Sequence, residues 1–240
     1  MTAVPCIRQV VLLVPDLDEA LAQTRDAFGF TSGTRDPESM AELGFVHEVC
    51  SFNDTFIELC APISADSVPG RLVERKGAVG YMLVVQVDDL AAVIDRAAGQ
   101  DIAPLFTQDF EGHPISQWHP KSLGTLAELD QIDPHDSWHF APRIFDASCT
   151  DVARDIVGAE LATPDPEAMA RTWSDMLDVP LSDPTTLPLQ DTVLRFVASA
   201  EGKSGLIAVD VAATEPARVG ETVHIGGVDF RFVADTAPAV

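Results

Sequence analysis

The sequence predicts an α+β fold made of repeated β-α-β-β-β units. Three observations lead to this prediction. Short apolar runs of strand length occur along the whole chain, and several are followed by stretches with apolar residues at helical spacing. The order of strand, helix and further strands then returns after about 70 residues. Self-similarity at a fixed period indicates copies of one supersecondary unit.

The first unit begins with a strand at residues 7–14, an apolar run too short for a typical helix. Asp16 suits the N-cap of the next element because its carboxylate can accept from free backbone N–H groups. Apolar residues at helical spacing then predict a helix over 17–28. Gly29 is placed to end it.

Two more strands are expected in this unit, at 45–52 and 55–61, with Asn53 and Asp54 forming a tight turn between them. A two-residue turn fixes the register of the hairpin. The pairs that it predicts are Phe52 with Thr55, Val49 with Glu58, and His47 with Cys60. His47 and Glu58 then face the same side of the sheet, because residues two apart on a strand share a face.

The second unit repeats this order. A strand at 79–87 precedes the capping pair Asp88 and Asp89, and a helix follows that Gly99 ends. Strands are predicted near 104–108, 115–119 and 125–130. Residues 1–133 therefore form a two-unit domain.

The sequence predicts a connector at residues 134–150 and a divergent third unit at 151–240. Strands in the third unit are expected at 156–163, 193–198, 206–211, 223–225 and 230–233. We expect this unit to complete a half-barrel by pairing across a homodimer, because its edge strands otherwise stay open.

The charge of the chain limits its partners. It has 38 acidic and 15 basic residues, a formal net charge of -23. Nucleic-acid binding needs clustered Lys and Arg, and an anionic membrane surface would repel such a chain. No run approaches the roughly 18 apolar residues that span a bilayer. The N-terminus shows no signal-peptide pattern, so a cytoplasmic protein with reduced thiols is the expectation.

Four short motifs occur in a fixed order: V-P-D-L after the first strand, I-E-L on a later strand, V-D-D-L after the second unit's first strand, and H-P-K-S-L-G-T-L-A-E-L-D. In this order they resemble the vicinal oxygen chelate superfamily, which contains glyoxalases, extradiol dioxygenases, bleomycin-resistance proteins and methylmalonyl-CoA epimerases. The segment 119–129 is most similar to the epimerase branch. The resemblance covers residues 5–131 and, more loosely, 156–233.

The resemblance implies that each pair of units curls into a half-open barrel around a divalent metal. Four residues at equivalent strand positions bind the metal. In this chain those positions hold Gln9, Glu58, Met82 and Glu128, and both of the family's histidines are missing. Carboxylate and amide oxygens suit hard cations, whereas a thioether is a poor ligand for Mg, Mn or Zn. Three hypotheses stay open: an atypical site for Mg, Mn, Co, Ni or Zn through Gln9, Glu58 and Glu128, a metal-free acid–base pair, or a binding pocket without chemistry.

Other residues near these positions have two interpretations each. His47 either replaces a lost ligand or acts as a base, or it is a histidine at the rim that only bonds the sheet. His119 either acts beside Glu128 as acid or ligand, with Trp118 as a pocket wall, or the two form a strand end with the aromatic ring in the core. Asp130 shares the side of Glu128, as part of an acidic wall or as a surface carboxylate.

Two segments outside the strands are also of interest. Arg71 belongs to the one compact basic cluster, with Arg75 and Lys76, which either attracts a phosphate-bearing thioester or is ordinary loop solvation. The connector, with His135 and His139 flanking Trp138, is either a lid over the pocket or a plain linker.

The leading functional hypothesis is an isomerase, epimerase or lyase that removes a proton next to a carbonyl of a small carboxylate or its thioester. Glu128 and Glu58 are the expected base and acid, Gln9 orients the substrate oxygen, and His47 and His119 assist. Trp118, Met82 and Arg71 are expected to contact the substrate. The alternative is a non-catalytic drug- or metabolite-binding protein in which Met82 forms part of an apolar pocket floor.

Overall fold

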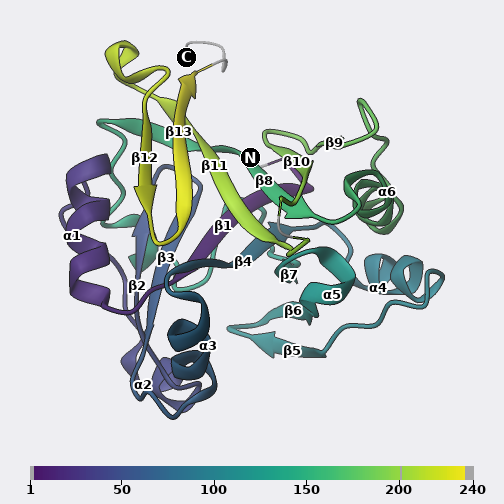
Figure 1. Ribbon diagram of the computed structural model, residues 1–240, viewed down its shortest axis with the longest axis horizontal. Helices are drawn as coiled ribbons and strands as arrows, with labels where there is room; N and C mark the ends of the chain where they lie inside the picture. Colours follow the sequence, from purple (N-terminus) through teal and green to yellow (C-terminus); the bar gives the residue numbers. More distant parts are fainter. Residues whose placement is uncertain (1–2, 201, 236–240) are drawn as a thin grey trace.

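The computed structural model describes residues 3–200 and 202–235, and Figure 1 shows their arrangement. The N-terminal half is ordered as follows: β1 (Cys6–Leu13), α1 (Leu17–Phe28), α2 (Pro37–Glu42), β2 (Phe45–Ser51), β3 (Phe56–Pro62), α3 (Val68–Lys76), β4 (Val79–Gln86), α4 (Leu90–Ala98), β5 (Phe106–Phe110), β6 (His113–Trp118), α5 (Pro120–Leu123) and β7 (Leu126–Asp130). The C-terminal half has the following elements: the short helix η1 (Arg143–Phe145), β8 (Ala153–Thr163), α6 (Pro166–Leu177), β9 (Thr186–Pro188), β10 (Val193–Ala198), β11 (Gly205–Ala213), the short helix η2 (Pro216–Arg218), β12 (Thr222–Ile225) and β13 (Val228–Ala234).

The strands of the N-terminal half form one curved sheet in the order β2-β3-β1-β4-β7-β6-β5. Its two central strands, β1 and β4, are antiparallel to each other. Each also pairs in parallel with a later strand, β1 with β3 and β4 with β7. The α+β class is therefore correct, and the sheet is large, mixed and open.

The C-terminal half follows a matching order, β9-β10-β8-β11-β13-β12. Its central strands β8 and β11 are antiparallel, with β10 and β13 as their parallel neighbours. The two halves join in a single sheet where β11 pairs with β4 at Leu206 and Gly80. The outer strands β9 and β12 each pair with one neighbour, β10 and β13 respectively, so the expected pairing across a homodimer stays a prediction.

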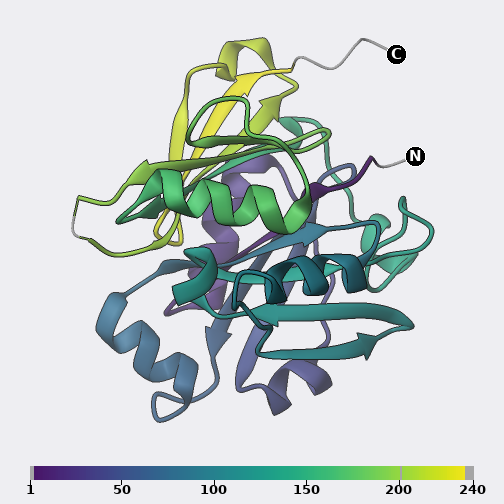
Figure 2. The same cartoon turned by 90° about the vertical axis from the view of Figure 1, so that its right-hand side faces the viewer.

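An aspartate caps the start of each of the helices α1, α4 and α6, as the sequence predicts for Asp16 and Asp89. Asp16, Asp89 and Asp165 each accept a hydrogen bond from the backbone N–H three residues further on, at the starts of α1, α4 and α6. Gly29 ends α1 with φ of 80°, a conformation that favours glycine. Figure 2 shows α4 and α6 side by side over one flank of the molecule.

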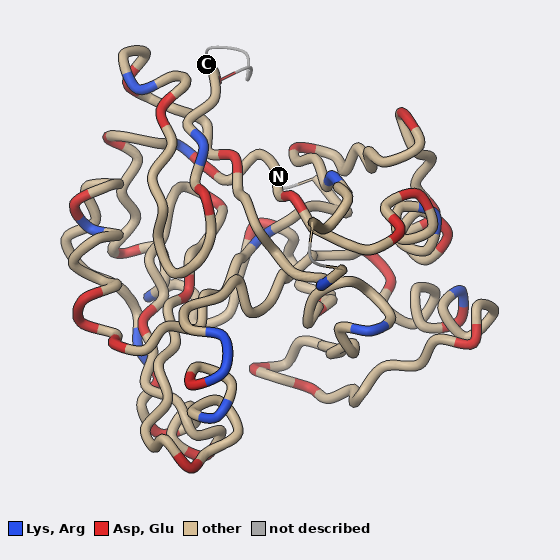
Figure 3. The backbone as a smooth tube through the Cα atoms, in the orientation of Figure 1, with Lys and Arg blue, Asp and Glu red and all other residues tan. Residues whose placement is uncertain are grey.

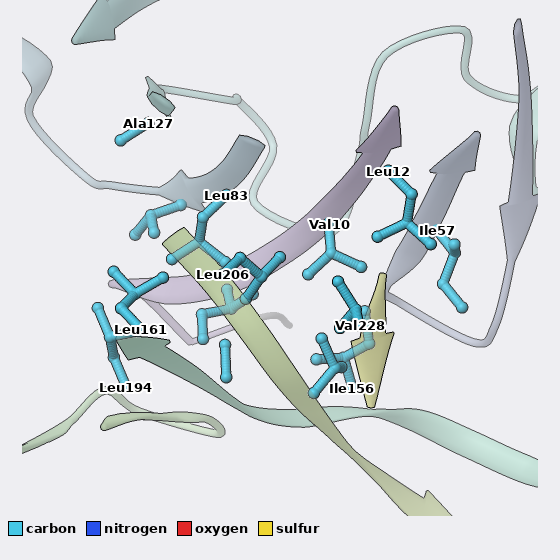
Figure 4. Close-up of a cluster of buried hydrophobic side chains, with 14 of the residues drawn as sticks. Val10, Leu12, Ile57, Leu83, Ala127, Ile156, Leu161, Leu194, Leu206 and Val228 are labelled. Atoms are coloured by element: carbon cyan, nitrogen blue, oxygen red, sulfur yellow. The ribbon is translucent and has the colours of Figure 1, made fainter. Parts of the chain in front are cut away.

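The core lies between the two halves and defines the inner side of the first sheet. Along β1, Val10 and Leu12 are fully buried against residues of the C-terminal half such as Leu161 and Leu206 (Figure 4). Side chains alternate along a strand, so Gln9 and Val11 point to the opposite, concave face. The concave face is where a cavity forms.

Acidic residues are spread over both halves in Figure 3, with no acidic segment set apart from the fold. Within the described ranges, no helix is long and apolar enough to cross a membrane. The four cysteines are free thiols.

Candidate functional site

A cavity of about 450 Å³ opens on the concave face of the N-terminal sheet. All seven strands of this sheet contribute side chains to its wall. The helix α2 and the connector supply the remainder. The polar residues that line it are Gln9, Asp36, Ser39, His47, Glu58, Gln108, Gln117, Glu128 and His139.

Glu58 lies at the centre of a buried hydrogen-bond chain. The Gln9 amide Nε2 donates to Glu58 Oε2 at 2.8 Å, and His47 Nδ1 lies 2.6 Å from Glu58 Oε1. Trp138 Nε1 donates to Gln9 Oε1 at 3.1 Å. Because the indole N–H can only donate, the amide of Gln9 has one orientation, with its oxygen toward Trp138 and its NH₂ toward Glu58.

The protonation of His47 follows from its second ring nitrogen. The backbone N–H of Asp36 donates to His47 Nε2 at 2.7 Å, so Nε2 carries a lone pair and the ring is neutral. The proton is therefore on Nδ1 and is donated to Glu58. Glu58 thus accepts hydrogen bonds on both oxygens, an arrangement that stabilises a carboxylate.

Glu128 has a different environment, across the sheet on β7. Its Oε2 accepts one hydrogen bond from Gln117 Nε2 at 2.7 Å, and the same Gln117 nitrogen lies 3.8 Å from the sulfur of Met82. Burial, with a further contribution from nearby Asp130, raises the pKa of Glu128 to about 8. Near neutral pH Glu128 is therefore a carboxylic acid that opens into the cavity.

Asp130 and His139 form a second buried pair beside Glu128. His139 Nε2 lies 3.0 Å from Asp130 Oδ2, while Asp130 Oδ1 and His139 Nδ1 are buried without a hydrogen-bond partner among the described residues. Burial raises the pKa of Asp130 well above its usual value and lowers that of His139. Both shifts disfavour charge on the pair, of which His139 lines the cavity.

The connector reaches the cavity because Arg8 holds it there. Arg8 is fully buried on β1, and its guanidinium donates to the side-chain oxygen of Gln86 at 2.5 Å and to the carbonyl oxygens of His135 at 2.9 Å and Ser137 at 3.2 Å. It also lies over the Trp138 ring, 4.8 Å from the centroid. The connector is thus a fixed wall of the cavity.

The structure brings five of the predicted site residues together. Gln9, His47, Glu58, Met82 and Glu128 all line the cavity. The register behind the placement of His47 is confirmed, because Val49 pairs with Glu58 and His47 with Cys60. Asp130 lies on the side of Glu128, as expected, but it is fully buried instead of exposed.

Three predicted site residues lie elsewhere. His119 is exposed and caps α5 by accepting from the backbone N–H of Lys121, because the chain turns away from the sheet at that residue. Trp118 is fully buried in the core between the halves, on the other face of β6 from Gln117. Arg71 is exposed on α3 and donates to the backbone oxygen of Asp66.

Gln117 and His139 were missed as cavity residues. Gln117 had a usable signal, because it pairs with Glu128 across β6 and β7 and alternates with Trp118. His139 had none, since its position depends on the path of the connector.

Comparison with known proteins gives the family. A profile of the glyoxalase-like domain matches residues 10–177, from the middle of β1 to the end of α6. The chain belongs to this glyoxalase-like family. The resemblance to the vicinal oxygen chelate superfamily is thereby confirmed.

Similar proteins differ in how much of the glyoxalase-like chain they match. An ethylmalonyl-CoA/methylmalonyl-CoA epimerase of Cereibacter sphaeroides is 29% identical over 132 residues, 52% of this chain and 97% of the relative. A hypothetical protein from Staphylococcus aureus matches 95% of this chain and 98% of its own at a TM-score of 0.66 and 14% identity. A mutant 4-hydroxymandelate synthase from Streptomyces coelicolor matches 89% and 72% at a TM-score of 0.66 and 14% identity. The two structures show the fold.

The donor set at the family's metal position does not fit a divalent metal. Gln9 directs its oxygen to Trp138 and only its NH₂ toward the other positions, and Met82 contributes a thioether. Among residues 3–200 and 202–235, no three His, Cys, Asp or Glu side chains gather closely enough to hold a metal ion.

This misfit gives a prediction. Mg, Mn, Co, Ni or Zn should leave the melting temperature of the wild-type protein unchanged, whereas the double variant Gln9→His/Met82→His should bind Zn or Co at near one per chain and gain stability. Thermal shift and elemental analysis measure both. A wild-type protein that purifies with one metal per chain would contradict the misfit.

Glu128 also predicts how stability depends on pH. Between 4.5, its ordinary pKa, and about 8, the folded protein keeps a proton that the unfolded chain has released. The free energy of unfolding contributed by this group therefore falls as pH rises through that window. Glu128→Gln removes the contribution, so the melting temperature of the variant relative to wild type should rise from pH 5.5 to 8.5. If the melting temperatures of wild type and Glu128→Gln change in parallel with pH, the raised pKa of Glu128 is wrong.

Proposed function

We propose that the cavity catalyses proton transfer at the carbon next to a carbonyl group, as an isomerase, epimerase or lyase that works without a metal. One observation carries this proposal: two carboxyl groups in one cavity have different surroundings. Glu58 accepts hydrogen bonds from Gln9 and His47 on its two oxygens, while Glu128 has a pKa of about 8. Two carboxyl groups whose environments differ in this way suit the roles of base and acid.

In the proposed step, Glu58 takes a proton from the carbon next to the carbonyl. The C–H bond breaks, its electron pair forms the carbon–carbon double bond of an enolate, and negative charge develops on the carbonyl oxygen. Gln117 and Tyr81 line the cavity and can donate hydrogen bonds to that oxygen. Glu128 delivers its proton to the carbon, which for an epimerase occurs on the opposite face.

Solvent deuterium exchange tests this function. The purified protein is incubated in D₂O with a panel of ketones, thioesters and small carboxylates that have an exchangeable proton next to the carbonyl. Mass spectrometry and NMR then measure incorporation of one deuterium at that carbon. Exchange above the buffer rate for at least one compound supports the proposal. Compounds that bind tightly and never exchange contradict it.

A second candidate function is ligand sequestration without chemistry. The cavity wall favours sequestration in one respect. Met82 occupies a position where the family has a metal ligand, and aromatic rings also line the cavity. The name of the epimerase relative and the two carboxyl states favour catalysis. The exchange experiment separates the two functions, since a sequestering protein binds without exchange.

A further inference from the structure

The cavity contains acids but lacks basic side chains. Among the described residues that line it, none is Lys or Arg, whereas Asp36, Glu58 and Glu128 all face it. Its two histidines are neutral: His47 accepts on Nε2 from a backbone N–H, and burial lowers the pKa of His139. A ligand inside this cavity therefore meets no positive side chain.

The nearby arginines lie outside the lining of the cavity. The guanidinium of Arg143 is 5.4 Å from the ring centroid of Phe140, a lining residue. Arg8 binds Gln86 and the connector carbonyls behind the cavity wall. Arg25 and Arg35 both form ion pairs with Glu48. Arg71 is on α3, outside the lining of the cavity. A ligand carboxylate would have to lose water in the cavity without gaining a counter-charge, which is unfavourable in a buried site.

The walls are suited to apolar rings. Phe45 and Tyr81 lie with ring centroids 6.0 Å apart, and Phe110 and Phe140 lie 5.9 Å apart. Phe106 completes the aromatic wall at the outer strand β5 and is 40% exposed. Aromatic side chains of this kind bind flat apolar groups with large contact area.

We infer that the ligand portion entering this cavity is an uncharged carbonyl compound with an apolar, ring-sized group, and that the cavity rejects carboxylates. That the ligand contains a reacting carbonyl group rests on the proposed function. That the cavity discriminates by charge does not depend on it. The inference separates this chain from a relative named for malonyl thioesters, because a malonyl group carries a free carboxylate.

A matched pair of ligands tests the inference. 2-Propionylnaphthalene is a neutral aryl ketone with an exchangeable CH₂ group, and 6-propionyl-2-naphthoate is the same ketone with one carboxylate. Isothermal calorimetry at pH 7.5 should give a Kd for the neutral ketone at least tenfold lower than that for the carboxylate. Equal or tighter binding of the carboxylate would overturn the inference, as would failure of both to bind.

Variants at Phe106 give a second, independent readout. Phe106→Arg places a cation at the partly exposed edge of the cavity, and Phe106→Gln removes the ring without adding charge. The arginine variant should bind the carboxylate at least tenfold more tightly than the glutamine variant does. An equal affinity in the two variants would overturn the inference.

Deuterium exchange in the same samples keeps the two proposals apart. If the neutral ketone binds preferentially and does not exchange, the charge selectivity stands and the proposed proton transfer loses its support for this ligand class. If the carboxylate binds better and exchanges, the proton transfer stands and the inferred ligand class is wrong.

Discussion

Glu128→Gln should reduce deuterium exchange next to the carbonyl by roughly 10²- to 10⁴-fold, the usual contribution of a general acid or base. Glutamine keeps the size of the side chain and can still interact with Gln117, but its amide cannot act as a general acid or base at neutral pH. Ligand affinity should change much less than the rate, because the neutral amide replaces a neutral carboxylic acid. Exchange rates by NMR and affinities by calorimetry measure the two effects separately.

Glu167→Gln is the matched control for this variant. Glu167 is exposed on α6 and pairs only with Arg171 on the same helix, at 3.5 Å. Its loss should leave both exchange and binding unchanged. Full exchange activity in Glu128→Gln would show that another group moves the proton, and the roles proposed for the two cavity carboxyls would be wrong.

Arg8→Met should lower the free energy of unfolding by about 3 kcal/mol, since hydrogen bonds that involve a charged group contribute roughly 1.5–3 kcal/mol each and unpaired buried acceptors add a penalty. Methionine fills much of the volume of the arginine stem but cannot donate to Gln86 or to the connector carbonyls. Trp138 also loses the cation over its ring. Urea denaturation followed by circular dichroism measures the change.

Arg171→Met serves as the control, with an expected change within about 0.5 kcal/mol because surface ion pairs contribute little. A loss below 1 kcal/mol in Arg8→Met would mean that the cost of burying the guanidinium cancels its hydrogen bonds. The connector would then need another explanation for its fixed position.

Local patterns in the sequence predicted much of the fold. The two-residue turn at Asn53 and Asp54 set the hairpin register, and Phe52 N donates to Thr55 O at 2.9 Å as that register requires. The C-terminal half was harder to divide. Between β11 and β12 it has only the three-residue η2, where the other first strands are followed by a full helix, so the helical period that marks a unit is absent.

The site was predictable where strand alternation decides it. Gln9, Glu58 and Glu128 face the cavity because their neighbours Val10, Ile57 and Leu129 are buried in the core. The same alternation would have placed Gln117 in the cavity and Trp118 in the core. The connector was not predictable in this way, because Arg8 holds it through backbone carbonyl groups, which leave no pattern in the sequence.

The shared core has a consequence for any attempt to divide this chain. Leu161, Leu206 and Val228 of the C-terminal half belong to the same buried cluster as Val10, Leu12 and Ile57 (Figure 4). A fragment cut at residue 150 would keep every cavity residue and yet expose that apolar face to water. We expect such a fragment to aggregate, and the intact chain to melt in one cooperative transition. The cavity residues thus come from the N-terminal half and the connector, while the core beneath them is shared with the C-terminal half.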